Sequence, residues 1–209
     1  MFKITLDQVY RPFFMFFRTR RMKSFKEIFR VTKTTKILDV GGTYFVWTLV
    51  PDLPIPIIVN VSYPENDNKQ TTWIVADGRR LPFADRSFDI VFSNSVIEHL
   101  GTFENQLLFA KECRRVGGRY YVQTPNRWFF IEPHFLTPFI HYLPKRFQRK
   151  LLKWTVWAMI TNPSEERIEA VIEEIRLLDE HEFRILFPDA QILKEKVLWF
   201  TKSLIAVRT

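Results

Sequence analysis

Small and polar residues follow three short apolar runs in the first half of the chain. Asp39 lies in the first run, before Gly41 and Gly42; Asp77-Gly78 follows the second run, and Asn94-Ser95 the third. Apolar runs that stop at such residues are typical of buried parallel strands, whose carboxyl ends open into a ligand crevice. Glycine lets the backbone approach a ligand, and carboxylate oxygens accept hydrogen bonds from amino and hydroxyl groups. The three positions therefore predict one site for a nucleotide-type ligand.

A second group of residues has the chemistry of proton transfer. His99 follows Glu98 after the third run, and Glu132 and His134 interrupt an apolar, proline-rich stretch. Because histidine titrates near neutral pH, His99 and His134 are candidates for a general base, with Glu132 as an alternative partner. The competing interpretation is structural: a surface histidine at a capped helix start, and polar residues that shape an insertion through ordinary hydrogen bonds. No metal-ligand cluster is evident in the sequence, and Cys113, the single cysteine, is expected in the core.

These residues need a scaffold in which strands and helices alternate. Strands are predicted at 37–40, 57–61, 73–76, 88–93 and 119–123, with a hairpin formed by 192–200 and 203–207. Helices are predicted from Ser24, at 102–116, after Asn162-Pro163, and from Asp179 to Pro188. The alternation predicts an α/β fold: a doubly wound, mostly parallel seven-stranded sheet with one antiparallel strand.

The length of 209 residues fits a single domain. We expect one domain over 1–209, with a basic, aromatic N-terminal extension at 1–36 and a lid or acceptor-binding insertion at 127–161. Trp154 and Trp157 are expected in the core of a lid helix. One cysteine excludes an internal disulfide and favours a reducing, cytoplasmic setting.

In these motifs the chain resembles the class I S-adenosylmethionine-dependent methyltransferases, in particular a small single-domain, type-11-like group. The resemblance is carried by Asp39-Val40-Gly41-Gly42, by Asp77-Gly78 with Leu81-Pro82-Phe83, and by Ser93-Asn94 with Glu98-His99. It implies the Rossmann-like methyltransferase fold and S-adenosylmethionine as the cofactor. The usual later glycines of the first loop are replaced by Thr43, Tyr44 and Phe45, which suggests a tighter, partly aromatic pocket.

The resemblance also implies roles for single residues. Asp39 would help to order the amino end of the cofactor's methionine portion, and Gly41, Gly42 and Thr43 would form the loop beside it. Asn60 stands where the family has an acidic residue for the ribose hydroxyls. Asp77 would accept from the adenine amine, with the Gly78 amide beside the ring. Asn94 and Ser95 would face the reactive sulfonium.

The charge of the chain is a signal about its partners. The net charge is +8, and the basic residues concentrate in 1–36 and 101–150, which are also rich in Phe. One interpretation of 1–36 is a helix packed on the domain edge with a solvated basic face. The other is an aromatic, cationic surface for an anionic membrane or a lipid-linked substrate, and nucleic acid is a less favoured partner.

Together these observations predict methyl transfer from S-adenosylmethionine to a small or amphipathic acceptor, at oxygen, with a lipid-linked or glycan precursor as the favoured class. Two alternatives stay open: an RNA-directed methyltransferase, and a non-catalytic methyltransferase-fold binding module. The expected setting is cytoplasmic with contact to a membrane surface, and the oligomeric state is not predicted.

Overall fold

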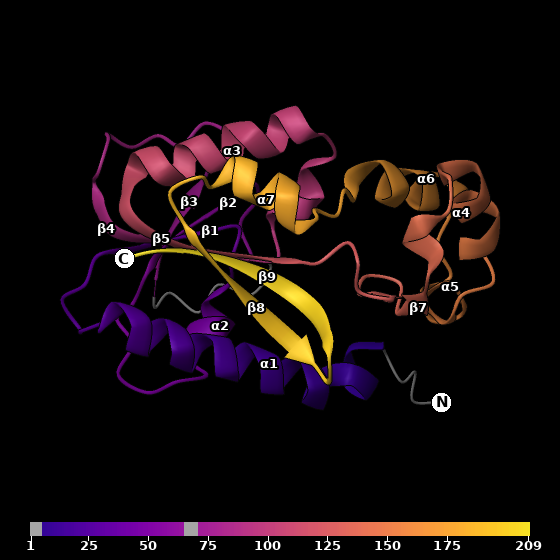
Figure 1. Cartoon of the computed structure of the whole chain (residues 1–209), viewed down its shortest axis with the longest axis horizontal. Coiled ribbons are helices and arrows are strands. Elements are labelled where there is room, and N and C mark those ends of the chain that lie inside the picture. Colours follow the sequence, from indigo (N-terminus) through magenta and orange to yellow (C-terminus); the bar gives the residue numbers. More distant parts are fainter. Residues whose placement is uncertain (1–5, 65–70) are drawn as a thin grey trace.

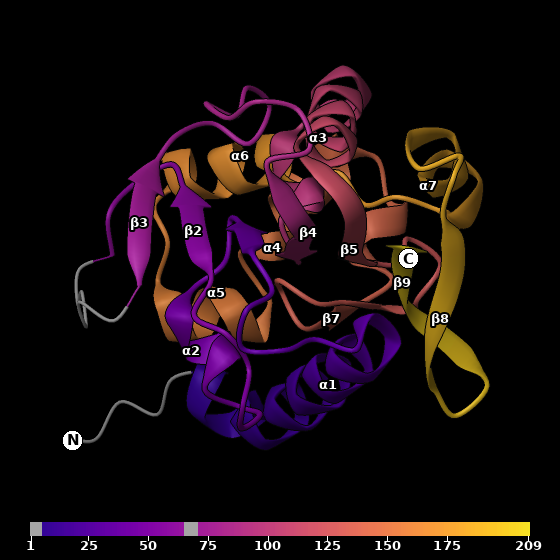
Figure 2. The same ribbon diagram turned by 90° about the vertical axis from the view of Figure 1, so that its left-hand side faces the viewer.

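The computed structural model describes residues 6–64 and 71–209 (Figure 1). A seven-stranded sheet crosses the molecule in the order β3-β2-β1-β4-β5-β9-β8 (Figure 2). Its strands are β1 (Ile37–Val40), β2 (Ile57–Asn60), β3 (Thr72–Val75), β4 (Phe88–Asn94), β5 (Gly117–Pro125), β8 (Gln191–Val197) and β9 (Phe200–Arg208). Strands β1 to β5 pair in parallel, and β9 is antiparallel to both of its neighbours. The predicted fold class is therefore confirmed.

Strand β5 begins earlier than predicted. Gly117 both caps helix α3 (Phe103–Val116) and opens the strand, where it pairs with Phe88 of β4. A Cβ atom on Gly117 would lie 2.6 Å from Cγ2 of Val91. The missing side chain thus lets the chain pass from helix to strand without a loop.

Helices cover both faces of the sheet (Figure 1). On one face, α3 and α7 (Glu180–Leu186) bury Phe109, Cys113 and Phe183 against the strands, so that Cys113 is a core residue as predicted. The other face is covered by α1 (Leu6–Phe29) and the short helix α2 (Tyr44–Trp47). Both predicted caps, Thr102 of α3 and Asp179 of α7, accept hydrogen bonds from backbone amides of the first turn.

Helix α1 is much longer than the helix predicted from Ser24, because Ser24 lies within the helix instead of at its start. Met22 and Phe25 are fully buried and Phe29 is nearly so, and this spacing places the three side chains on the face toward the sheet. Phe25 packs edge-on against Phe92 of β4 at 5.0 Å between ring centroids. The basic segment is thus a structural layer of the fold as well as a charged one.

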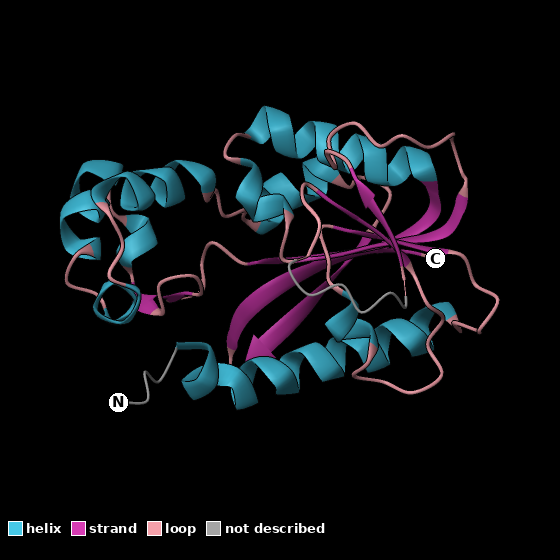
Figure 3. Cartoon of the chain, turned by 180° about the vertical axis from the view of Figure 1, so that it is seen from behind, coloured by secondary structure: helices cyan, strands magenta, loops and turns pink. Residues whose placement is uncertain are grey.

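A small lobe stands beside the carboxyl end of the sheet (Figures 1 and 3). It contains β6 (Ile131–Glu132), β7 (Thr137–Pro138), the 3-10 helix η2 (Ile140–Tyr142), α4 (Lys145–Leu152), α5 (Val156–Thr161) and α6 (Glu165–Glu174). It has an apolar core of its own, built by Phe135, Ile140, Leu152, Ile168, Val171 and Ile172. The lobe therefore extends beyond the predicted insertion at 127–161, because α6 supplies half of that core.

The two tryptophans of the lobe differ in their surroundings. Trp157 packs against Phe135 with ring centroids 5.3 Å apart, as expected of a core residue. Trp154 is 78% exposed, so the prediction that it lies in the core was wrong. Within the described residues, no helix is both long enough and apolar enough to span a bilayer.

Candidate active site

A cavity of about 390 Å³ lies where β1, β2 and β4 end, as expected at the carboxyl edge of a parallel sheet. Of the predicted site residues, six line it: Gly41, Asn60, Asp77, Gly78, Ser95 and His99. Val40, Val59, Val96, Leu100 and Phe109 supply most of the apolar wall. The three strand-end motifs therefore meet at one cavity, although they are far apart in the sequence.

The turn that follows β1 and borders this cavity requires glycine at position 41. Gly41 has a φ of +79°, and a Cβ there would lie 2.6 Å from both methyl groups of Val96. The side-chain nitrogen Nδ2 of Asn60 donates to the carbonyl oxygens of Gly41 and Gly42, at 3.4 and 3.3 Å. Asn60 thus ties β2 to the glycine turn, a connection that a carboxylate could not make because it has no donor.

Asp39 lies beneath this turn and does not line the cavity. Its side chain is fully buried, and its Oδ2 accepts a hydrogen bond of 2.8 Å from the indole nitrogen of Trp47. Its Oδ1 has no hydrogen-bond partner in the described part of the chain. Burial raises the pKa of Asp39 to about 7, against the opposing effect of the Trp47 hydrogen bond. Gly42 covers the carboxylate closely, since a Cβ there would lie 1.9 Å from Oδ2, and Thr43 caps α2.

Asp77 follows β3 and is paired with Arg79. The guanidinium donates to both carboxylate oxygens, with Nη2 at 2.6 Å from Oδ2 and Nε at 3.0 Å from Oδ1. This hydrogen bonding lowers the pKa of Asp77, so the carboxylate stays ionised. Gly78 leaves no room for a side chain, because a Cβ would lie 2.9 Å from the Phe109 ring.

The two predicted residues at the end of β4, Asn94 and Ser95, have different surroundings. Ser95 has a φ of +56° and lines the cavity, and its hydroxyl donates to Gln123 at 2.9 Å. Asn94 does not line it: its Oδ1 accepts a hydrogen bond from Arg21 of α1. Arg21 is buried and also donates to Gln123 at 2.5 Å.

Arg21 belongs to a buried ionic cluster that joins α1 to the C-terminal hairpin. Its Nε lies 3.2 Å from Oε1 of Glu195, and Nζ of Lys202 lies 3.0 Å from Oε2 of the same residue. Burial lowers the pKa of Lys202 in spite of the nearby carboxylate. The cluster holds α1 across the ends of β4 and β5, and nothing in the spacing of these residues predicted it.

The predicted catalytic residues form one hydrogen-bonded chain. His99 lies on the 3-10 helix η1 (Ile97–Leu100), and its Nε2 is 3.2 Å from Nε2 of His134, which follows β6. Nδ1 of His134 lies 2.6 Å from Oε1 of Glu132, and Nδ1 of His99 lies 2.7 Å from Oε1 of Glu174. Burial alone would lower the pKa of His134, but the hydrogen bond and charge of Glu132, with the charges of Glu98 and Glu174, raise it.

Glu98 is the buried member of this group. Its side chain is 0% exposed, Oε2 accepts a 3.0 Å hydrogen bond from Thr124, and Oε1 lacks a partner among the residues described. Burial raises its pKa, and the charges of His134 and His99 oppose that effect. The backbone of Glu98 is tied to the end of α6, since its carbonyl accepts from the Arg176 amide at 2.8 Å.

Glu98 and Glu174 were not among the predicted catalytic residues. The adjacent Glu98-His99 pair was a visible signal, but an acidic residue in a polar segment is ordinarily solvated. Glu174 offered no signal, because it lies 75 positions beyond His99 and only the docking of α6 on η1 brings the two together.

A family model described as a methyltransferase domain matches residues 58–122, a segment that runs from β2 to β5. A comparison with curated protein sequences finds no match. The matched segment contains Asp77-Gly78 and Glu98-His99, two of the motifs on which the resemblance was based.

Solved structures match the fold over most of the chain. A protein from Pyrococcus horikoshii aligns with a TM-score of 0.56 and 19% identity, covering 91% of this chain and 89% of its own. A SAM-dependent methyltransferase from Methanosarcina mazei aligns with a TM-score of 0.51 and 13% identity, covering 85% and 92%. The match to a sarcosine dimethylglycine methyltransferase from Galdieria sulphuraria has a TM-score of 0.43 and 20% identity, and covers 51% of this chain and 45% of that one.

At these identities the structural matches establish the fold, and the family model adds the motif-bearing segment. The chain thus has the Rossmann-like methyltransferase fold, and its residues 58–122 match the type-11 methyltransferase domain. The matched methyltransferase domain indicates S-adenosylmethionine as the cofactor and methyl transfer as the general activity.

Proposed function

We propose that this methyltransferase transfers the methyl group to an oxygen atom of an amphipathic, negatively charged acceptor. The observation that carries the proposal is the position of His99, which lines the cofactor cavity and is linked through His134 to the buried Glu132. A general base must lie within hydrogen-bond reach of the proton it removes, and this histidine borders the space where the methyl donor would lie.

The residues of the cavity fit the cofactor. A volume of about 390 Å³ lies within the range of ligand sites. The ammonium group of the cofactor would also supply the hydrogen-bond partner that Asp39 Oδ1 lacks. We assign the methionine portion to Asp39, Gly41, Gly42 and Thr43, the ribose to Asn60, the adenine to Asp77 and Gly78, and the sulfonium side to Ser95 with Asn94 behind it.

The transfer itself is an in-line displacement at the methyl carbon. The positive charge of the sulfonium disappears in this step, so the protein mainly supplies alignment and exclusion of water. An oxygen acceptor must also lose a proton. We assign that proton to His99 or His134, with Glu132 orienting His134 through its Nδ1 hydrogen bond.

A second cavity of about 260 Å³ adjoins Glu132 on the side of the lobe. It is lined by three basic side chains, Arg127, Lys145 and Arg176, together with Phe135 and Ile172. Lys145 is paired with Glu173 and Arg176 with Glu182, so Arg127 is the cation beside the apolar wall that best suits an anion with an apolar part. We therefore propose this cavity for the negatively charged portion of the acceptor.

Exposed aromatic side chains support an amphipathic acceptor. Phe130 packs against Phe200 of the C-terminal hairpin at 5.3 Å and against Phe139 at 6.3 Å, and Tyr142 connects Phe139 to Trp128. We call these five residues the aromatic band. Trp128 is 62% exposed and Phe139 57%. Contiguous apolar surface of this kind marks interaction sites, and aromatic rings suit the boundary between lipid and water.

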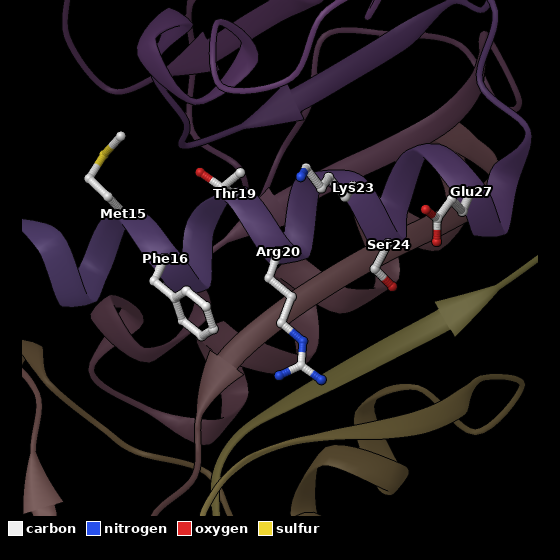
Figure 4. A pocket seen from close by; sticks show the side chains of 7 residues that line it. All are labelled: Met15, Phe16, Thr19, Arg20, Lys23, Ser24 and Glu27. Carbon is white, nitrogen blue, oxygen red and sulfur yellow. The ribbon is translucent and has the colours of Figure 1, made fainter.

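Helix α1 adds a further aromatic and cationic surface. A groove of about 690 Å³ runs along it, and its described lining residues all belong to this helix, among them Phe16, Arg20 and Lys23 (Figure 4). The groove contains none of the residues predicted for the cofactor or for catalysis. It is compatible with contact to an anionic surface.

The proposal is tested by methyl transfer from labelled S-adenosylmethionine into three fractions: a lipid extract, aqueous small molecules and RNA. Label in an anionic lipid or lipid-linked compound is the expected result, released by mild alkali from a methyl ester and only by hydriodic acid from a methyl ether. Label in RNA would contradict it. Binding of S-adenosylhomocysteine without transfer to any fraction would favour a non-catalytic module instead.

A matched pair of variants tests the second cavity. Arg127→Gln should raise KM for the acceptor about tenfold, because one charge-assisted contact is lost. Arg167→Gln, on the exposed face of α6, should leave KM unchanged. Equal effects of the two changes would remove the second cavity from the proposal.

A further inference from the structure

The groups between the cofactor cavity and the lobe have the geometry of a metal site. A carboxylate oxygen of Glu98, one nitrogen of His99 and one of His134 lie within 4.8 Å of one another. The two Nε2 atoms are 3.2 Å apart. Two nitrogens bound to one tetrahedral Zn²⁺ at about 2.0–2.1 Å are separated by roughly 3.4 Å, so the imidazoles are already spaced as a ligand pair.

The hydrogen bonds on the far side of each imidazole favour a cation between them. Nδ1 of His99 faces Glu174 and Nδ1 of His134 faces Glu132, so each Nδ1 carries the proton and donates it to a carboxylate. In the neutral rings both Nε2 atoms then have lone pairs, and because these atoms face each other at 3.2 Å, either a proton or a metal ion can lie between them. A carboxylate behind each ligating histidine is the usual surrounding of a protein metal site.

Glu98 completes the set of ligands. It is fully buried, and its Oε1 has no hydrogen-bond partner within the described residues, which is costly for a carboxylate. Thr124 holds the other oxygen at 3.0 Å, and Oε2 of Glu132 is held by the Phe135 amide at 2.7 Å. The outer contacts therefore orient the ligands, leaving Glu98 Oε1 without a described partner and the two Nε2 atoms facing each other.

We propose that Glu98, His99 and His134 bind one divalent transition-metal ion of the Zn²⁺ class. Two imidazoles and one carboxylate suit such an ion better than Mg²⁺ or Ca²⁺, which prefer oxygen ligands only. Three protein ligands leave a tetrahedral position open, as in catalytic zinc sites. Because His99 lines the cofactor cavity, that position would lie next to the space for the methyl donor.

Metal binding does not depend on the proposed function, but the role of the metal in the reaction does. An acceptor hydroxyl at the open position would have a lowered pKa and would lose its proton to solvent. The oxygen would then form the new bond to the methyl carbon as the sulfur–methyl bond breaks. In the loaded enzyme the metal would thus take over the activation that the histidines provide alone.

The test is metal titration of the whole, chelator-treated chain, with Co²⁺ followed by visible absorption and Zn²⁺ by calorimetry. We expect one equivalent to bind, with the intense absorption of four- or five-coordinate Co²⁺. Glu98→Gln and His134→Asn should each abolish this signal. His181→Asn, an exposed histidine of α7, should bind as the unaltered chain does.

The carboxylates behind the histidines give a graded control. Glu174→Gln should weaken metal binding about 10–100-fold, and Glu173→Gln, its exposed neighbour, should not. Titration with S-adenosylhomocysteine on the same samples separates the two sites. A folded, cofactor-binding chain that takes up no metal would overturn the inference and leave the histidine pair sharing a proton. Equal metal binding by the Glu98→Gln and His181→Asn variants would also overturn it.

Discussion

The cofactor half and the lobe half of the site are built in different ways. Gly41, Asn60 and Asp77 lie at the ends of neighbouring parallel strands, so the order of the sheet brings them together. The histidine chain instead combines η1 with β6 and the end of α6, across sequence separations of 35 and 75 positions. The first half can be predicted from local motifs because strand ends share one edge. The second half depends on how a lobe docks.

The largest expected effect is a loss of kcat on substitution of His134, with cofactor affinity retained. Its side chain does not line the cofactor cavity but bonds to both His99 and Glu132. His134→Asn should lower kcat about 10²–10⁴-fold, the usual contribution of general acid–base or metal activation. Affinity for S-adenosylhomocysteine should stay within about twofold of the unaltered chain. A variant that loses cofactor affinity instead would show that the two halves are not independent.

The buried Asp39 in the cofactor half should make the stability of the chain depend on pH. Its pKa is about 7 in the folded chain and near 3.8 in the unfolded chain, so the folded state binds the proton more tightly. Its contribution to stability is therefore full below about pH 4 and is lost as the pH rises to about 7. We expect Asp39→Asn to gain stability relative to the unaltered chain over this range, by up to about 4 kcal/mol.

Chemical denaturation at about pH 4, 6 and 8 measures that difference, with Asp52→Asn as the control because Asp52 is exposed. Parallel pH profiles for the unaltered chain and Asp39→Asn would mean that folding does not raise the pKa of Asp39. If the ammonium group of S-adenosylhomocysteine is the missing partner of Oδ1, bound S-adenosylhomocysteine should reduce the difference in unfolding free energy between the unaltered chain and Asp39→Asn.

Gly41 provides a test of the backbone in the cofactor half. Gly41→Ala combines a positive φ with a contact of 2.6 Å to Val96, and should cost about 1–3 kcal/mol in the free energy of unfolding. S-adenosylhomocysteine binding should weaken as well, because the turn must shift. Gly118→Ala is the matched control, since a Cβ there meets nothing within 4 Å. Equal melting temperatures for the two variants would argue against this account of the turn.

A smaller effect is expected at Asp77. Asp77→Ala should weaken S-adenosylhomocysteine binding about tenfold, equivalent to about 1.4 kcal/mol, because one carboxylate acceptor for the adenine amine is lost. Asp85→Ala, an exposed residue paired with Arg115, should leave that affinity unchanged. Calorimetry decides the matter, and an unchanged affinity in Asp77→Ala would place the adenine elsewhere.

The smallest expected change concerns the surface of the molecule. Trp128→Ser in the aromatic band should alter unfolding by less than about 0.5 kcal/mol, since the side chain is 62% exposed. It should nevertheless reduce the flotation of the chain with anionic vesicles. Met159→Ser on α5 is the control, since Met159 is 71% exposed and lies outside the aromatic band. Flotation that is absent in the unaltered chain would remove the membrane surface from the proposal.

The sequence by itself determined the sheet, the strand ends and the identity of the cofactor. Apolar runs and capping residues such as Thr102 act locally, and parallel strands leave few ways to arrange themselves. It also marked His99, Glu132 and His134 as candidates for proton transfer, but it could not show that they form one hydrogen-bonded chain.

Only the tertiary structure decided which side chains meet at the candidate site. Asn94 was expected beside the sulfonium, and Arg21 of α1 binds it instead. Glu98 and Glu174 join the histidines because α6 packs on η1, a contact whose partners lie far apart in the chain. Local patterns report how a residue's own segment folds. Glu98 Oε1 becomes buried, with no partner among the described residues, only when the lobe packs against the sheet. No single segment of the sequence could therefore predict this burial.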